Sequence, residues 1–236
     1  MTGLLGADLL KLGGVGGVHS TRNVLVLALQ ALLLLEQLHA ADLVHRDIKP
    51  ENLVLGCAGT AEARKLHLID FGTSDWLVDN NGVRYTKPQA IEGTMPYMAV
   101  TVHQRKPLGK RDDLESLVWT LIRLCLGKLP WEHSKISPAA LVKHKLRVSK
   151  QGVESDPACE SLPTYMAKCF DGMLAHVRAL DMPESEPDYA LLRGSVETAW
   201  KALHAERLPL LIRALPFAAL FSTGPTIANA DVDYKL

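Results

Sequence analysis

The sequence predicts a mainly α-helical fold of the α+β class, in which short β-hairpins accompany a set of core helices. Residues 21–38 and 114–125 carry apolar side chains at the three-and-four spacing of buried helices. Residues 52–55 and 66–69 are short apolar runs on either side of a polar turn, a pattern typical of paired strands. Helices therefore dominate the predicted fold.

Composition limits the classes of protein to which this chain can belong. Of its 236 residues, 47% are hydrophobic and 22% are charged, which suits one soluble globular domain with its own core. Lysine plus arginine and aspartate plus glutamate both total 26, so the formal net charge is zero. Zero net charge gives no general attraction for nucleic acid, and we expect no nucleic-acid partner.

The cysteines and the first residues indicate an intracellular protein. Cys57, Cys125, Cys159 and Cys169 show neither the close pairing of a zinc site nor the density of a disulfide scaffold. Residues 1–12 lack the basic start, apolar middle and cleavage pattern of a signal peptide. We therefore expect a reducing compartment: the cytoplasm, the nucleus or both.

The first core helix follows a glycine cluster at residues 13–17, which predicts a flexible loop. Ser20 or the threonine after it can cap the helix, which runs to about Leu38. Its most apolar part, residues 24–35, is interrupted by Gln30 and is shorter than the roughly 20 residues that a bilayer core requires. We expect a buried helix rather than a membrane span.

The strand pair should bring residues 47–53 close to residue 70. Residues 73–93 form a polar, glycine-containing segment without clear periodicity, long enough to be a functional loop or a disordered one. The second core helix should end at Gly127 and Pro130.

The last third of the chain has three further helical patterns, at residues 139–150, 162–180 and 188–203. Prolines recur after Arg207. We expect the part of the chain that follows to be weakly structured.

The residues that point to chemistry lie in two motifs. Residues 45–53 read His-Arg-Asp-Ile-Lys-Pro-Glu-Asn-Leu, and Asp70, Phe71 and Gly72 follow after the predicted strand pair. The first motif resembles the catalytic loop of protein kinases over its full length, and the second resembles their Asp-Phe-Gly motif at the expected separation. Turn chemistry or solvated charges would explain any one of these residues but not the ordered set.

The resemblance implies a protein kinase-like C-terminal lobe, with its β-hairpins at the catalytic cleft, that uses ATP and Mg²⁺. Asp47 would accept the proton of the substrate hydroxyl, and Lys49 would neutralise charge on the transferred phosphoryl group. Asn52 and Asp70 would hold Mg²⁺ through oxygen ligands. These four residues are the candidate site.

A narrower resemblance, to the casein kinase I family, rests on later residues. Residues 111–117 read Arg-Asp-Asp-Leu-Glu-Ser-Leu, and residues 129–131 read Leu-Pro-Trp, like the start and end of that family's central helix. Residues 170–189 resemble its late helices, so the likeness runs over residues 4–192. It implies that Asp113 bonds to the backbone of the catalytic loop from the N-terminus of a helix.

The resemblance also raises a question about substrates. Residues 93–97 lie where the family closes its activation segment, but Pro96 replaces an arginine that can bind phosphate. A preference for substrates that are already phosphorylated is therefore in doubt. Basic residues further on could attract acidic protein substrates or form a solvated helix face; they are Lys143, Lys145, Arg147 and Lys150.

The resemblance divides the chain into two parts. Residues 1–205 would form the C-lobe portion of a protein kinase domain from the hinge onward, and residues 206–236 a weakly structured tail. Met1 would lie at about the hinge, so we expect the N-terminal lobe to be missing. The glycine cluster lacks the spacing of the nucleotide-binding loop and would connect two helices.

The leading hypothesis for the function is a serine/threonine protein kinase of casein kinase I type. A second hypothesis is a truncated, catalytically silent kinase relative that acts as a binding or scaffold module. A third is a small-molecule kinase of similar architecture, which the string around Asp113 disfavours. Fold resemblance alone would not separate these functions.

Overall fold

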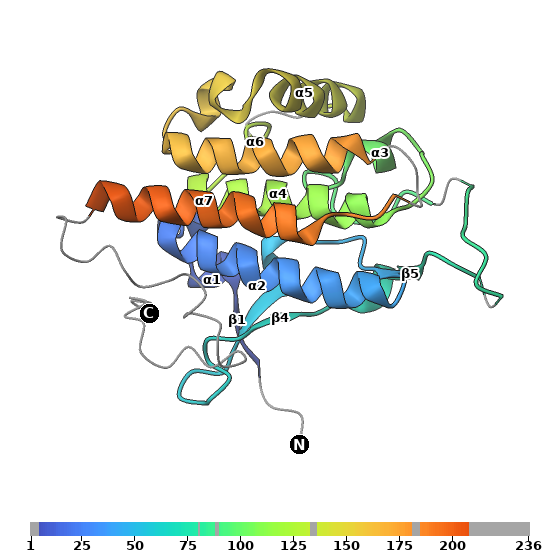
Figure 1. The fold of residues 1–236 in the computed structure, drawn as a ribbon, viewed down its shortest axis with the longest axis horizontal. Helices are drawn as coiled ribbons and strands as arrows, with labels where there is room; N and C mark the ends of the chain where they lie inside the picture. The colour runs from blue at the N-terminus through green and yellow to red at the C-terminus, as the bar shows by residue number, and fades with distance from the viewer. Residues whose placement is uncertain (1–4, 80, 88–89, 133–135, 181–184, 208–236) are drawn as a thin grey trace.

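Five long helices stack on one another, with a small β-sheet at one end, in the computed structural model (Figure 1). The structure describes residues 5–79, 81–87, 90–132, 136–180 and 185–207. The long helices are α2 (Thr21–Ala40), α4 (Lys110–Leu126), α5 (Pro138–Gln151), α6 (Thr164–Ala179) and α7 (Tyr189–Arg207). The short helices are α1 (Leu9–Leu12), α3 (Val100–His103) and the 3₁₀ turns η1 (Val15–Gly17), η2 (Pro50–Asn52), η3 (Phe71–Thr73), η4 (Val153–Ser155) and η5 (Pro157–Cys159).

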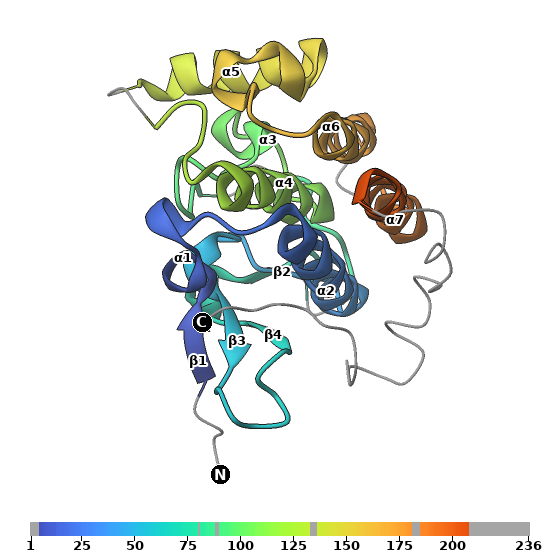
Figure 2. The same ribbon diagram turned by 90° about the vertical axis from the view of Figure 1, so that its left-hand side faces the viewer.

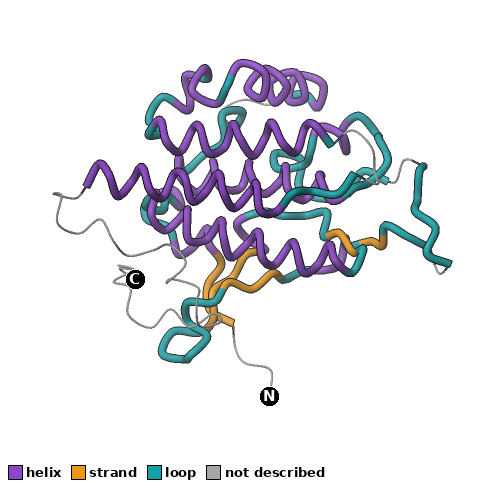
Figure 3. The backbone as a smooth tube through the Cα atoms, viewed as in Figure 1, coloured by secondary structure: helices purple, strands orange, loops and turns teal. Residues whose placement is uncertain are grey.

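The strands form two small antiparallel sheets, one at the opposite end of the stack from α5 and one beside α2 (Figures 2 and 3). The strands are β1 (Leu5–Asp8), β2 (Leu43–Val44), β3 (Leu53–Gly56), β4 (Leu66–Leu68) and β5 (Asp75–Trp76). The first sheet has the order β1-β3-β4, and β2 pairs with β5 in the second. The predicted strand pair is confirmed as β3 and β4, in which Val54 lies opposite His67.

Helix α4 is the centre of the stack. Helices α2 and α6 both pack against α4, and α7 contacts both α2 and α6. Every residue of α4 from Lys110 to Ile122 is buried, including its charged first turn. Burial of charge is costly unless each charge has a partner. The start of α4 is therefore a place where buried polar groups must be bonded.

Both predicted core helices are confirmed. Ser20 caps α2 by accepting a bond from the Asn23 amide (3.3 Å), and α2 ends two residues later than predicted. Gly127 ends α4 in the left-handed conformation (φ 74°), which a glycine adopts without strain. Helix α4 begins before its apolar pattern, because its first turn is polar yet buried.

Helix α2 is long and apolar enough to cross a membrane. In the fold it packs between α4 and α7, and ten of its residues are buried. Its apolar surface is therefore part of the core, as predicted.

The remaining predictions differ from the structure mainly at short elements. The glycine cluster is confirmed as a connector, since η1 joins α1 to α2. The segment 73–93 includes β5 and a bridge between Val78 and Arg84. Elements β1, β2, β5, α1 and α3 were not predicted, because two to four residues are too few to show a periodicity.

The three late helices are confirmed within a few residues of their predicted bounds as α5, α6 and α7. Helix α7 extends through Arg207, whereas the predicted tail begins at residue 206. Residues 208–236 lie outside the described residues, and the division into a domain and a tail stays a prediction.

Candidate active site

The candidate site is built on the loop between β2 and β3, which contains η2. The side chain of Asp47 is almost fully buried there, and three residues bond its carboxylate. Lys49 Nζ donates to Asp47 Oδ2 (2.6 Å), Asn52 Nδ2 donates to the same oxygen (3.2 Å), and the Thr94 amide donates to Oδ1 (2.8 Å). Asn52 Nδ2 also donates to the Asp47 carbonyl (2.8 Å), which fixes the turn of the loop.

These contacts decide the charge of Asp47. Burial by itself would raise the pKa of this carboxyl group, but the bonds from Lys49 and Thr94 outweigh that effect and hold the pKa below its usual value. Asp47 is therefore an anion at neutral pH, and Lys49 and Thr94 join through a further bond between Nζ and Oγ1 (2.9 Å).

Asp70 follows β4 and stands in the left-handed conformation (φ 63°), which is strained for a residue other than glycine. Its neighbour Ile69 donates a backbone bond to the Asn52 carbonyl (3.0 Å), so the structure places the two predicted motifs side by side. The Asp70 carboxylate is exposed and accepts a long bond from the Gly72 amide (3.4 Å). It is not part of the bonded cluster of Asp47, Lys49 and Asn52.

The donor set fits Mg²⁺ better than a softer metal. No group of three or more histidine, cysteine, aspartate or glutamate side chains gathers to hold a metal within the described ranges. Asn52 and Asp70 each supply oxygen, and Mg²⁺ commonly binds one or two protein side chains while phosphates and waters complete its shell. An exposed Asp70 beside Asn52 suits a cation that arrives with a phosphate ligand.

His45 fastens the Asp-Phe-Gly turn to the catalytic loop. Its Nε2 donates to the Ile69 carbonyl (2.9 Å), and its ring meets the ring of Phe71 edge-on at 5.0 Å. Thr73 Oγ1 donates to the His45 carbonyl (3.1 Å). The position of residues 69–73 is thus set by a histidine that is itself fully buried.

Asp113 in α4 holds the other end of the catalytic loop, as predicted. Its two carboxylate oxygens accept bonds from the amides of His45 (2.7 Å) and Arg46 (2.8 Å), and His39 Nε2 lies 3.0 Å away. Burial would raise the pKa of Asp113, but the bonds from His39 and from the His45 amide lower it overall. The carboxylate that caps α4 is instead Asp112, which accepts a bond from the Gly109 amide (2.8 Å).

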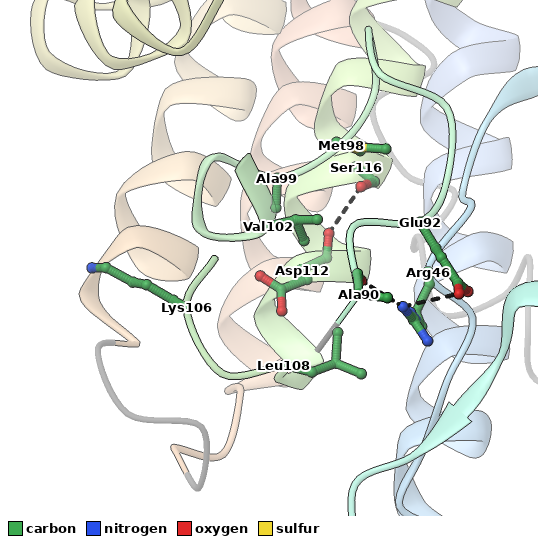
Figure 4. Close-up of a pocket in the computed structure, with 10 residues that line it drawn as sticks. All are labelled: Arg46, Ala90, Glu92, Met98, Ala99, Val102, Lys106, Leu108, Asp112 and Ser116. Carbon is green, nitrogen blue, oxygen red and sulfur yellow. Dashed lines mark hydrogen bonds and ion pairs between the residues drawn. The ribbon is translucent and has the colours of Figure 1, made fainter. Parts of the chain in front are cut away.

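Arg46 links the catalytic loop to the segment 73–93 (Figure 4). Its guanidinium group donates to the Ala90 carbonyl (2.9 Å) and forms ion pairs with Glu92 (3.4 Å) and Asp75 (3.3 Å). In Figure 4 the contacts of Arg46 with Ala90 and Glu92 lie on one side of a pocket whose opposite side is lined by Met98 and by side chains of α3 and α4. The arginine is therefore already neutralised by two carboxylates of this segment.

Thr94 belongs to the bonded cluster around Asp47, although it was not among the four predicted site residues. Its role depends on Gly93, whose φ of 106° is accessible to glycine but strained for other residues. A Cβ atom at Gly93 would lie 2.4 Å from the Arg46 carbonyl oxygen. The adjacent glycine and threonine were the sequence signal for this turn. The sequence did not indicate that Thr94 would contact Asp47, because the two residues are 47 positions apart.

Two other residues were missed, His39 and Tyr189. The Tyr189 hydroxyl bonds to His39 Nδ1, and His39 Nε2 reaches Asp113, so a buried polar chain runs from α7 through α2 to the catalytic loop. The sequence signals were a histidine near the end of an apolar helix and a tyrosine at the end of the family-like segment 170–189.

The basic run in α5 requires a correction. Lys145 does not face solvent: its side chain is fully buried, so it cannot attract an acidic substrate. It lies on the side of α5 that packs on the core, one turn after the buried Leu141. Lys143, Arg147 and Lys150 are exposed, and Arg147 is paired with Asp156 (2.7 Å).

Comparisons with known proteins agree with this geometry. The family model described as protein kinase domain matches residues 6–179. The chain is 30% identical over 190 residues to Casein kinase I homolog 2 of Schizosaccharomyces pombe, an alignment that covers 79% of this chain and 42% of that protein. It is 33% identical over 177 residues to Casein kinase I homolog 1 of Saccharomyces cerevisiae (74% and 32%).

A rice relative shares a shorter region. Casein kinase 1-like protein HD16 of Oryza sativa is 43% identical over 122 residues, which is 50% of this chain and 17% of that protein. The chain thus spans less than half the length of each of these relatives.

Proposed function

Because the chain belongs to the protein kinase domain family, we propose that it transfers the γ-phosphoryl group of ATP to serine and threonine hydroxyls of proteins, as an enzyme of casein kinase I type. The observation that carries the proposal is the Asp47 carboxylate, which is buried, ionised and oriented by Lys49, Asn52 and Thr94. A carboxylate held in this way can receive a proton at a defined position.

In the proposed reaction the substrate hydroxyl gives its proton to Asp47 while its oxygen bonds to the γ-phosphorus. The bond between that phosphorus and the bridging oxygen breaks, and ADP leaves. Lys49 stands 2.6 Å from Asp47 and brings a positive charge to the place where the phosphoryl oxygens would gather. Most of the catalysis in such a transfer comes from positioning and charge stabilisation.

Asn52 and Asp70 would hold Mg²⁺, which supplies charge neutralisation for the phosphates when it is bound. Asn52 already uses its amide nitrogen to bond Asp47, so its amide oxygen is the group left for a cation. The same side chain would then connect the metal to the proton acceptor. This connection supports the assignment of Asn52 and Asp47 to one site.

Protein substrates and an intracellular location are part of the proposal. Pro96 offers no donor for a phosphate, and its carbonyl accepts a bond from Trp131 Nε1 (3.1 Å). Of the basic run, only Lys143 and Lys150 are both exposed and without a carboxylate partner among the ion pairs of the described residues. We therefore propose at most a modest preference for acidic substrates.

A reducing location suits the four cysteines, all of which are free thiols.

The alternative is a catalytically silent binding module. The exposed Phe71 (48%) and Leu5 (44%), on the Asp-Phe-Gly turn and β1, would suit contact with another protein surface. The complete set of Asp47, Lys49, Asn52 and Asp70 supports an enzyme instead, since a silent module needs none of them.

Replacement of Asp47 tests the proposal. The 236 residues include no Gly-x-Gly-x-x-Gly nucleotide loop, so the assay uses the chain joined behind the N-terminal lobe of a casein kinase I relative. Asp47→Asn keeps the shape but loses the proton acceptor, and we expect turnover with Mg-ATP and a serine peptide to fall by at least about 100-fold. Asp70→Ala should weaken Mg-ATP binding, because one oxygen ligand is lost.

The matched control is Glu51→Gln, a comparable change at an exposed residue of η2. It should leave turnover within about twofold of the unchanged protein, because surface substitutions rarely have large effects. Equal turnover in Asp47→Asn and Glu51→Gln would contradict the assignment, and transfer absent from every version would favour the binding module.

A further inference from the structure

Lys145 is an ionisable residue in a place where a charge is costly. It lies in α5 with its side chain fully buried between two tryptophan rings, Trp119 at 5.6 Å and Trp131 at 5.0 Å from Nζ. A methionine or leucine would fill this space without the cost of removing an amine from water. The contacts of the amine therefore indicate what the lysine does.

The amine donates to the carbonyl of Met98 at 2.6 Å. Met98 precedes α3 and belongs to the segment 94–98, which begins with the site residue Thr94. In Figure 4 the Met98 side chain lines the pocket across from Arg46. Lys145 thus bonds the backbone of a residue that lines the same pocket as Arg46 of the catalytic loop.

Segment 94–98 is one tight turn. The Thr94 carbonyl accepts bonds from the amides of Tyr97 (2.9 Å) and Met98 (3.2 Å), so the turn moves as a unit. Trp131 Nε1 donates to the Pro96 carbonyl (3.1 Å), which gives the turn a second anchor next to Lys145. At its other end the turn presents Thr94 to the site.

Thr94 links the anchored turn to the site residues. Its amide donates to Asp47 Oδ1 (2.8 Å), and its hydroxyl accepts from Lys49 (2.9 Å). A displacement of the turn by one ångström would break both bonds, since hydrogen bonds weaken steeply with distance. The anchors on Pro96 and Met98 are therefore in position to control how the site residues are oriented.

We propose that Lys145 is a positioning residue: through the Met98 carbonyl it holds the turn 94–98, and with it Thr94, against Asp47 and Lys49. The proposal rests on the proposed function only for its effect on turnover, because the contact itself can be measured without any substrate.

Amide hydrogen exchange of the full 236-residue chain tests the contact. In Lys145→Met, which keeps the apolar stem and loses the donor, we expect protection of the amides of Thr94, Tyr97 and Met98 to fall by about tenfold. Amides in the middle of α4 should keep or gain protection, because a buried amine has been removed. If Lys145 merely filled space in the core, its substitution would change the protection of all amides together or of none.

Two further variants keep the test decisive. Lys143→Met, an exposed residue of the same helix, should leave every amide unchanged. Trp131→Phe removes the second anchor but keeps an aromatic ring, and it should lower protection at the same three amides. It also replaces Lys145→Met as the test if that variant fails to fold. Unchanged protection of Thr94 in a folded Lys145→Met chain would overturn the proposal.

Turnover provides a separate readout in the form joined to an N-terminal lobe. We expect Lys145→Met to lower kcat several-fold with a smaller change in the KM for ATP. This is because Thr94 orients Asp47 and Lys49, which act in the phosphoryl transfer, whereas within the described residues it forms no hydrogen bond with Asn52 or Asp70. If exchange changes as expected but the parent protein has no activity, the proposed function fails and the positioning role stands. If kcat falls while Thr94 protection is unchanged, the positioning role is wrong.

Discussion

At the scale of single residues, Gly93 shows how much the site depends on one backbone conformation. Its φ of 106° sets the direction in which the chain enters Thr94, and its missing Cβ lets it lie against the Arg46 carbonyl. Any side chain at this position would strain the backbone and collide with the catalytic loop at the same time. The effect on the site should then exceed that of backbone strain alone.

We expect Gly93→Ala to lower the free energy of unfolding by about 2–4 kcal/mol and turnover by at least about tenfold. The added Cβ would lie 2.4 Å from the Arg46 oxygen, so Thr94 must move away from Asp47. Urea unfolding and peptide phosphorylation measure the two effects. Gly59→Ala is the control, because Gly59 also has a positive φ (81°) but open space around its Cβ position.

For that control we expect only the strain of the positive φ, about 1 kcal/mol, and unchanged turnover. If the two glycine variants were equally stable and equally active, the close approach of Gly93 to the catalytic loop would be incorrect.

At the scale of elements, the buried Lys145 of α5 should make the stability of the fold depend on pH. Burial lowers the pKa of Lys145 from 10.5 to about 7, although Glu115 in α4 partly opposes the shift. Arg178 in α6 adds to it. His103 in α3 also interacts with Lys145. Burial lowers the pKa of His103 below 6.5, so His103 does not titrate in the pH range above 7 where Lys145 affects stability.

Between pH 7 and pH 10.5 the unfolded chain keeps a proton on Lys145 that the folded chain has released. Stability should therefore rise with pH in this window, with a slope of up to about 1.4 kcal/mol per pH unit from this residue. Below pH 7 both states carry the proton and the slope from Lys145 disappears. Urea unfolding between pH 6 and pH 8.5 measures this trend. At higher pH the buried thiols of Cys125, Cys159 and Cys169, whose pKa values burial raises, lower stability as the unfolded chain ionises.

Lys145→Met should remove that slope and raise stability most at the acid end of the window. Lys143→Met should keep it, because Lys143 is exposed. Parallel pH profiles for the unchanged chain and Lys145→Met would mean that the amine titrates far from neutral pH in the folded protein.

At the scale of the whole molecule, the sheet end and the Asp-Phe-Gly turn expose apolar side chains. Leu5 is 44% exposed and Phe71 is 48% exposed, while the core around α4 is closed. We expect the 236-residue chain by itself to associate at high concentration and to bind Mg-ATP weakly, since it has no glycine-rich loop of its own.

Light scattering and Mg-ATP titration, with and without a joined N-terminal lobe, measure these two properties. Joining the lobe should lower association and raise nucleotide affinity. Turnover by the 236-residue chain at the level of a full kinase, abolished by Asp47→Asn, would contradict this prediction and still support the assignment of Asp47.

The sequence by itself determined the long helices and the β3 and β4 pair, and it predicted the four candidate site residues. Each of these depends on signals that are local: a periodicity over a dozen residues, or a motif whose members are a few positions apart. For the same reason the end of α4 at Gly127 and the cap of α2 at Ser20 could be predicted. The family resemblance added Asp113.

Only the tertiary structure decided the partners of those residues. Thr94 meets Asp47 across 47 positions, and Lys145 belongs to a basic run whose other members are exposed, yet it turns into the core toward Met98. Whether a lysine faces water or a carbonyl depends on which side of its helix packs against α3 and α6. That choice is made by contacts between segments far apart in the chain, where the sequence pattern carries no local signal.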